Sequence, residues 1–204
     1  MTGDQVRRLF DVCETWPELL CLATFAYSGA RRAAVSKLRW RDIDRERGVM
    51  TFREKGGKIV RKPLPDTYAA ILNAAIEVGA VSIAPREYVV PSERLPRRAE
   101  RDDRVIYRIV KRLGARAGVD VHPHALRHAF SVRFLEQHPG EIEALQRILG
   151  HSKLETTQRY LRSMEQERLM ERMRDLNWGT RYEASGVEAP SGFEPLYGAL
   201  QAPA

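Results

Sequence analysis

Residues 124–161 read HALRHAFSVRFLEQHPGEIEALQRILGHSKLETTQRYL, and this stretch carries more structural and chemical information than any other part of the chain. It opens with a His and an Arg three positions apart, His124 and Arg127. A Gly-His-Ser follows with His151 at its centre, and Tyr160 stands nine residues after that His. Phosphoryl transfer needs an in-line nucleophile, cations around the non-bridging oxygens and a proton for the leaving oxygen. The residue types in this stretch match those three needs.

The first part of the stretch predicts a helix that presents His124 and Arg127 together. Pro123 suits the first position of a helix, and residues three positions apart lie on one helix face. We therefore expect the two side chains to reach the same phosphate.

The second part of the stretch predicts a bend between two helices. Residues 141–149 form an amphipathic pattern, and Gly150 suits the end of that helix. The Ser-x-x-Glu at 152–155 is the pattern of a capping box, which begins a new helix that carries Tyr160. The bend therefore fixes His151 relative to Tyr160.

The chemistry of these side chains favours a reaction without a metal. Two Arg guanidinium groups can each form paired hydrogen bonds to a phosphate as charge develops on it. A phenol with a pKa near 10 attacks only when a base or cationic surroundings help it lose its proton, and a Lys or His can protonate the departing hydroxyl. We therefore expect no metal and no cofactor.

Composition indicates a basic globular protein. The 204 residues suffice for one buried domain and a tail, and 34 Lys plus Arg against 27 Asp plus Glu give a net charge of +7. This balance favours an anionic partner such as nucleic acid, although a coding bias toward Arg gives the same count. Cys13 and Cys21 suggest structural thiols in a reducing compartment. The apolar run 19–27 is too short for a membrane span, so we expect a cytoplasmic protein.

Periodicity and turn residues predict a mainly helical chain with a small sheet. Gly29 suits a helix stop, and two glycines after Lys55 suit the tight turn of a hairpin. The predicted elements are one or two helices at 4–27, helices at 31–38 and 66–78, and a largely helical region at 103–176. The predicted strands are 49–54 and 58–64, with a third short strand at 87–90. The Gly-, Pro- and Ala-rich segment 177–204 predicts a flexible or disordered tail.

These motifs, in this order, resemble the catalytic domain of the tyrosine recombinases, the lambda-integrase and Xer-like family. The matching segments are Ser28-Gly29-Ala30-Arg31, the Trp-x-Asp-Ile at 40–43, the hairpin Lys55, the His-x-x-Arg of His124 and Arg127, the Leu-Gly-His-Ser at 149–152, and Tyr160. The resemblance covers residues 1–176, which we expect to form one catalytic domain of the mainly α, α+β class with a small antiparallel sheet.

The resemblance implies site-specific breakage and rejoining of double-stranded DNA, for integration or excision of a mobile element. Tyr160 would form a 3′-phosphotyrosyl link and release a 5′-hydroxyl, and Arg31 and Arg127 would hold the scissile phosphate. Lys55 would be the general acid, with Lys58 three residues away as its rival. His124 and His151 would bond the phosphate or help move protons. The family also implies assembly into a homotetramer on DNA.

Two departures from the family pattern keep other functions open. The family usually has an acidic residue three positions after the first Arg, and this chain has Ala34. Family members also commonly carry a helical DNA-clamping domain before the catalytic one, whereas this chain starts at the catalytic domain and is either a minimal or a truncated member. We therefore expect weaker and more salt-sensitive DNA binding than in a two-domain relative. The alternatives are a non-catalytic DNA-binding remnant of an integrase and a type IB topoisomerase-like enzyme.

Two further patterns suggest contacts. A basic stripe recurs every four residues, formed by Arg104, Arg108, Arg112 and Arg116. Like charges at this spacing repel one another, so the stripe is either a DNA-backbone contact or a plain solvated face. A charged helical segment after Tyr160 carries Leu161, Met164, Leu169, Met173 and Leu176. It either packs within the chain or docks on a neighbouring protomer on DNA.

Overall fold

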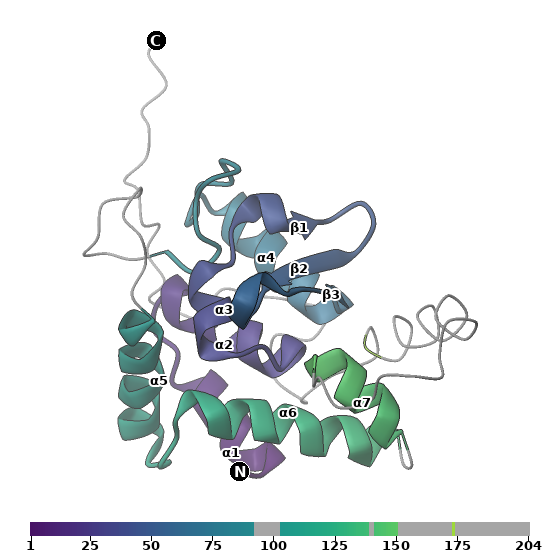
Figure 1. The fold of residues 1–204 in the computed structure, drawn as a ribbon. Helices are drawn as coiled ribbons and strands as arrows, with labels where there is room; N and C mark the ends of the chain where they lie inside the picture. The colour runs from purple at the N-terminus through teal and green to yellow at the C-terminus, as the bar shows by residue number, and fades with distance from the viewer. Residues whose placement is uncertain (92–102, 139–140, 151–172, 174–204) are drawn as a thin grey trace.

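A computed structural model describes residues 1–91, 103–138, 141–150 and 173 of the chain (Figure 1). The predicted mainly helical architecture with a small antiparallel sheet is confirmed. The helices are α1 (Gly3–Asp11), α2 (Trp16–Ser28), α3 (Arg32–Lys37), α4 (Asp66–Glu77), α5 (Arg104–Ala117), α6 (Pro123–Gln137) and α7 (Ile142–Leu149). Short 3₁₀ turns lie at η1 (Trp40–Asp42) and η2 (Lys55–Gly57), and the strands are β1 (Ile43–Asp44), β2 (Val49–Arg53) and β3 (Ile59–Pro63).

Helix α2 is the centre of the fold. Every one of its 13 residues is buried, which is the pattern of a helix enclosed on all sides rather than an amphipathic one. Helices α1, α4, α5 and α6 all pack against it, and in Figure 1 α6 runs below α2 with α5 at its start and α7 at its end. Cys13 and Cys21 are buried free thiols in this core, as expected.

The three strands form one antiparallel sheet in the order β1-β2-β3. The predicted hairpin is confirmed, with Phe52 opposite Val60 and Met50 opposite Lys62. Gly56 and Gly57 supply the positive φ values of the turn, 75° and 78°. Helix α3 packs on β2, so the hairpin stands directly beside the end of α2 and the start of α3.

The prediction of a third strand at 87–90 is wrong. The third strand is β1, which pairs Ile43 with Met50. Residues 87–90 contribute only an isolated bridge between Arg39 and Tyr88. The segment they face turns into η1 immediately after Arg39, so the ladder has no room to continue.

The remaining predicted elements agree where the structure describes them. The helices predicted at 31–38 and 66–78 are α3 and α4, and the region from 103 onward is helical in α5, α6 and α7. Met173 is also helical and fully buried in the core. The capping box at 152–155, the other apolar residues after Tyr160 and the tail 177–204 lie outside the described residues. No helix in the described part of the chain is long and apolar enough to cross a membrane.

Candidate functional site

The end of α2 places Arg31 at the surface of the core. Gly29 closes α2 in the left-handed conformation, with φ 56° and ψ 23°. Arg31 then stands as the N-cap of α3 in an extended conformation. Its side chain is 42% exposed and its Nη1 donates to Oε2 of Glu54, a side chain only 2% exposed. Arg31 therefore combines access from outside with a fixed anchor on the inside.

The glycine at position 29 is required by packing as well as by its backbone conformation. A Cβ added there would lie 2.4 Å from Cδ1 of Phe130, far inside van der Waals contact. Phe130 sits on α6 one turn after Arg127 and is fully buried. The close approach of α6 to the end of α2 is therefore what brings Arg127 next to Arg31.

Arg127 joins the two parts of the site that are separate in the sequence. Its Nη1 donates to the carbonyl of Gly29 at 2.8 Å, and its Nη2 donates to the carbonyl of Leu149 at 2.8 Å. Gly29 caps the end of α2, and Leu149 is the last residue of α7, next to the bend that precedes His151. Arg127 is only 6% exposed. Burial, and then the positive charge of Arg31, lower the pKa of Arg127 to about 10, while the Glu54 carboxylate opposes that shift.

His124 lies at the start of α6, as predicted from Pro123. Pro123 occupies the first helical position and His122 is the N-cap, accepting at Nδ1 from the backbone N–H of Ala125 at 3.2 Å. The rings of His122 and His124 are nearly parallel, with centroids 6.4 Å apart. His124 is exposed, so its ring is open to an incoming ligand. The neighbouring His128 is exposed as well.

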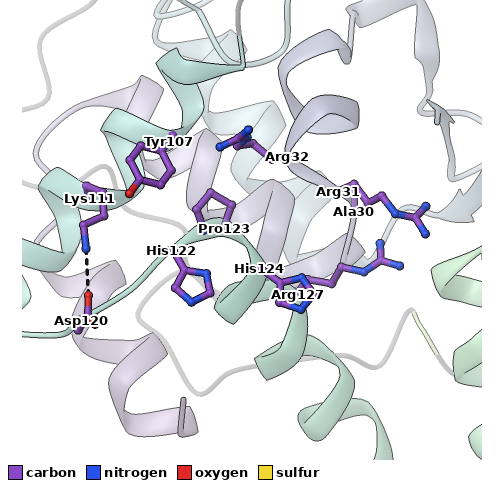
Figure 2. A pocket seen from close by; sticks show the side chains of 10 residues that line it. All are labelled: Ala30, Arg31, Arg32, Tyr107, Lys111, Asp120, His122, Pro123, His124 and Arg127. Atoms are coloured by element: carbon purple, nitrogen blue, oxygen red, sulfur yellow. Dashed lines mark hydrogen bonds and ion pairs between the residues drawn. The ribbon is translucent and has the colours of Figure 1, made fainter. Parts of the chain in front are cut away.

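A hollow of about 760 Å³ opens over these residues. Figure 2 shows Arg31, His124 and Arg127 along one side, with the Arg31 and Arg127 guanidinium groups pointing the same way. Lys111 and Asp120 close the far end with an ion pair of 2.9 Å. Arg32 lines the hollow and pairs with Asp103 at 2.9 Å. The hollow is thus lined mainly by cationic and imidazole groups, which suits a phosphate-bearing ligand.

The β2–β3 hairpin reaches the same region from the other side. Nζ of Lys58 donates to the carbonyl of Gly150 at 3.1 Å, and Val60 packs against the Cα of that glycine. Lys55 is the first residue of the turn η2. The hairpin therefore touches the bend at the end of α7 through the ammonium of Lys58, the rival of Lys55.

Two buried charges in the hairpin were missed by the sequence interpretation. Lys62 is 1% exposed and its Nζ donates to the carbonyl of Ser28 at 2.6 Å. Burial, and then the charge of Arg127, lower the pKa of Lys62 to about 7, against the opposing effect of Glu54. The alternation of inward and outward side chains in the sequence could have revealed both. Along the first strand it places Glu54 on the same inward face as Met50 and Phe52, and along the second it places Lys62 on the same face as Val60. A charge at an inward strand position needs a partner.

The basic stripe of α5 has acidic partners for two of its members. Nε of Arg112 lies 2.8 Å from Oε1 of Glu18, and Arg116 bonds both Glu14 and Glu18. Glu18 is 1% exposed. Arg104 and Arg108 are exposed. The pairing relieves the repulsion among the arginines without an external anion, which favours the solvated-face alternative for Arg112 and Arg116.

Two of the six predicted catalytic residues, His151 and Tyr160, lie outside the described residues, as does the side chain of Lys55. The structure brings together the other three, Arg31, His124 and Arg127. Among the described residues, no group of three or more His, Cys, Asp or Glu side chains is arranged to hold a metal ion.

A family model described as the phage integrase family matches residues 1–167, so the chain belongs to that family. Tyrosine recombinase XerA of Thermococcus kodakarensis is 34% identical over 164 residues, covering 78% of this chain and 56% of its own length. The chain thus spans about half the length of the curated relatives it matches.

Solved structures share the fold. The integrase from mycobacterium phage Brujita matches with a TM-score of 0.70 and 24% identity, over 88% of this chain and 58% of that one. A lambda integrase tetramer bound to a Holliday junction matches with a TM-score of 0.56 and 18% identity, over 78% of this chain and 49% of that one. The predicted fold class is therefore confirmed.

Proposed function

We propose that the chain is the catalytic domain of a site-specific tyrosine recombinase that cleaves and rejoins double-stranded DNA without a metal. Tyr160 attacks the scissile phosphate and forms a 3′-phosphotyrosyl link, and the 5′-hydroxyl leaves. Membership of the phage integrase family supports the proposal, as does the 34% identity to a tyrosine recombinase.

The observation that carries the proposal is the convergence of Arg31 and Arg127 from helices far apart in the sequence. Both residues line one hollow, and their guanidinium groups point the same way in Figure 2. Two neighbouring cations repel one another, and the charge of Arg31 adds to burial in lowering the pKa of Arg127. A fold that accepts such repulsion gains from an anion placed between the two groups, and the anion that DNA offers is a phosphate.

The remaining roles follow from this placement. His124 opens onto the same hollow and would bond a non-bridging oxygen or move a proton. Arg127 ties the end of α7 to the site through the Leu149 carbonyl, and His151 would enter from that bend. Lys55 would protonate the leaving 5′-hydroxyl from the hairpin.

The assembly on DNA is part of the proposal. A lambda integrase tetramer bound to a Holliday junction shares this fold, and we infer that this chain also acts as a homotetramer on two duplexes. Met173 is buried against the core of its own chain, which supports packing in cis for that part of the segment after Tyr160. Contact of Arg104 and Arg108 with the DNA backbone remains a prediction.

The test is a covalent-trapping experiment on supercoiled plasmid in excess EDTA, quenched with detergent. We expect relaxed DNA and a protein–DNA adduct from the wild-type protein, and neither from Tyr160→Phe. Relaxation by both proteins would contradict tyrosine chemistry. Binding without an adduct from either protein would instead support the non-catalytic remnant, and adducts without strand exchange between two duplexes would support a topoisomerase-like enzyme.

A further inference from the structure

The hairpin carries two buried ionisable side chains that have no part in the roles assigned above. Glu54 and Lys62 lie on the inward-facing register of β2 and β3, with side chains 2% and 1% exposed. Ionised groups are rarely buried unless they are paired, because leaving water costs several kcal/mol per ion. Both charges must therefore be held in place by something on the inner side of the sheet.

Each of the two charges contacts the segment that presents Arg31. Oε2 of Glu54 accepts from Nη1 of Arg31, and Nζ of Lys62 donates to the Ser28 carbonyl at 2.6 Å. Ser28 is the last residue of α2, and Arg31, three residues later, is the N-cap of α3. The hairpin thus binds both ends of the short segment 28–31, one by its backbone and the other by its side chain.

Helix α3 itself offers Arg31 no carboxylate. The position one turn on is Ala34, which is 2% exposed, and the first turn of α3 contains no acidic residue. The backbone of Glu54 is fixed by the turn, because its N–H donates to the Lys58 carbonyl at 2.8 Å and its carbonyl accepts from Gly57 at 3.2 Å. Its second carboxylate oxygen, Oε1, is buried without a hydrogen-bond partner among the described residues. Glu54 is therefore a rigid anion aimed at Arg31.

We propose that Glu54 is the positioning residue for Arg31, and that Lys62 supports it by fixing the Ser28 carbonyl at the other end of the segment. The proposal rests on the proposed function only in naming the scissile phosphate as the ligand of Arg31. A guanidinium held at one Nη by a carboxylate keeps its remaining N–H donors in a fixed plane. This pre-orientation is what a phosphate between Arg31 and Arg127 requires, because misplacement by about 1 Å can cost on the order of 100-fold in rate.

The test separates the position of Arg31 from activity. The Nε–Hε signal of Arg31, assigned by its loss in Arg31→Gln, is recorded by ¹⁵N NMR in the wild-type protein and in Glu54→Gln. We expect a distinct, slowly exchanging signal in the wild-type protein and an averaged one in Glu54→Gln. Should Glu54→Gln fail to fold, Glu54→Asp keeps the charge but shortens the side chain, and it is expected to weaken the signal in the same direction. An Arg31 signal unchanged in the folded variant would overturn the proposal.

A double-mutant cycle adds the functional readout. Adduct formation in the EDTA assay is expected to fall 10- to 100-fold in Glu54→Gln, and Glu54→Gln is expected to have no further effect in an Arg31→Gln background. Additive losses would show that Glu54 acts on something other than Arg31 and would overturn the proposal. If the wild-type protein forms no adduct while its Arg31 signal depends on Glu54, the positioning role stands and the proposed function falls.

Discussion

Two regions of this molecule hold half-exposed arginines over a buried glutamate, and they differ in what lies beside them. Arg31 is 42% exposed and pairs with Glu54, which is 2% exposed. Arg112 is 55% exposed and pairs with Glu18, which is 1% exposed. In isolation the two pairs are almost the same structure. Arg31 has a second, buried guanidinium beside it, that of Arg127, whereas Arg112 shares Glu18 with Arg116, which also bonds Glu14.

The comparison shows that a local group of arginines does not by itself mark the proposed phosphate site. Toward the end of α5, Arg112 and Arg116 are matched by Glu14 and Glu18, so this part of the surface is locally balanced. At the end of α2, Arg31, Arg127 and the amine of Lys62 share the single carboxylate of Glu54, so the two guanidinium groups already exceed its charge. The cluster is therefore unbalanced until an anion binds, and this imbalance is the physical basis of the proposed phosphate site.

The largest effect is expected from Arg127, which holds the unbalanced cluster together. Arg127→Ala leaves the carbonyls of Gly29 and Leu149 without this donor and removes a phosphate ligand. We expect adduct formation to fall by at least about 100- to 1000-fold. Arg127→Lys keeps the charge but cannot bridge both carbonyls, so it is expected to recover little activity. Full activity in Arg127→Lys would show that charge alone, rather than the bridge, matters.

The contact between α6 and the end of α2 can be broken without changing a charge. Gly29→Ala places a Cβ 2.4 Å from the Phe130 ring at a φ of 56°. Left-handed strain and overpacking together are expected to lower the free energy of unfolding by roughly 3 to 5 kcal/mol. The matched control is Gly57→Ala, which has a φ of 78° but nothing within 4 Å of the added Cβ. Equal losses in urea unfolding would remove the packing argument.

The buried side chain of Lys62 is expected to make the free energy of unfolding depend on pH. Burial lowers its pKa from 10.5 to about 7 in the folded protein. Between these values the unfolded chain binds a proton that the folded chain does not, so the free energy of unfolding rises with pH across this window. The rise, measured relative to Lys62→Met, is expected to be on the order of 3 kcal/mol from pH 7 to pH 10.

Lys62→Met supplies the background, since it removes the titrating group and keeps an apolar side chain of similar length. The charged groups that act on Lys62 are Arg127, Glu54 and Arg31, and all are retained in the variant. Parallel pH profiles for the two proteins would mean that Lys62 is not held with a lowered pKa.

A smaller effect is expected on α5. Arg116→Gln removes one partner of buried Glu18 but leaves Arg112 in place, so a loss of about 1 kcal/mol in unfolding free energy is expected. Burial opposes the ionisation of Glu18, but the hydrogen bond from Arg116 and the neighbouring charges outweigh it and lower the pKa below 4.5. The loss is therefore expected at neutral pH and should disappear as pH falls through that lowered pKa. Arg108→Gln, on an exposed position of the same helix, is the control and should change stability little.

Much of the fold was predictable because it depends on local rules. Gly29 as a helix stop, Pro123 as a helix start and the glycines at 56 and 57 each act through their own backbone. The strand β1 was missed because two residues are too short for a period-2 pattern to show. The segment 87–90 has apolar residues suited to a strand, but tertiary context gave it only one bridge.

The site was predictable in its members but not in its connections. The spacing of His124 and Arg127 indicated a shared face, yet nothing in the sequence indicated that Arg127 would bond the carbonyls of both Gly29 and Leu149. The family pattern places an acidic residue at the position of Ala34, whereas in this chain the carboxylate that contacts Arg31 is that of Glu54, on the hairpin. Such long-range pairing depends on how the hairpin packs against α3, which local patterns do not encode.

The most direct measurement compares the two matched arginines in the covalent-trapping assay. Arg31→Gln and Arg112→Gln each remove one half-exposed guanidinium from a buried glutamate, so their general structural costs should be similar. We predict that Arg31→Gln lowers the yield of the Tyr160-dependent adduct by about 100-fold or more, whereas Arg112→Gln stays within a few-fold of the wild-type protein. Equal yields from the two variants would contradict the account, because the scissile phosphate would then not depend on the cluster at the end of α2.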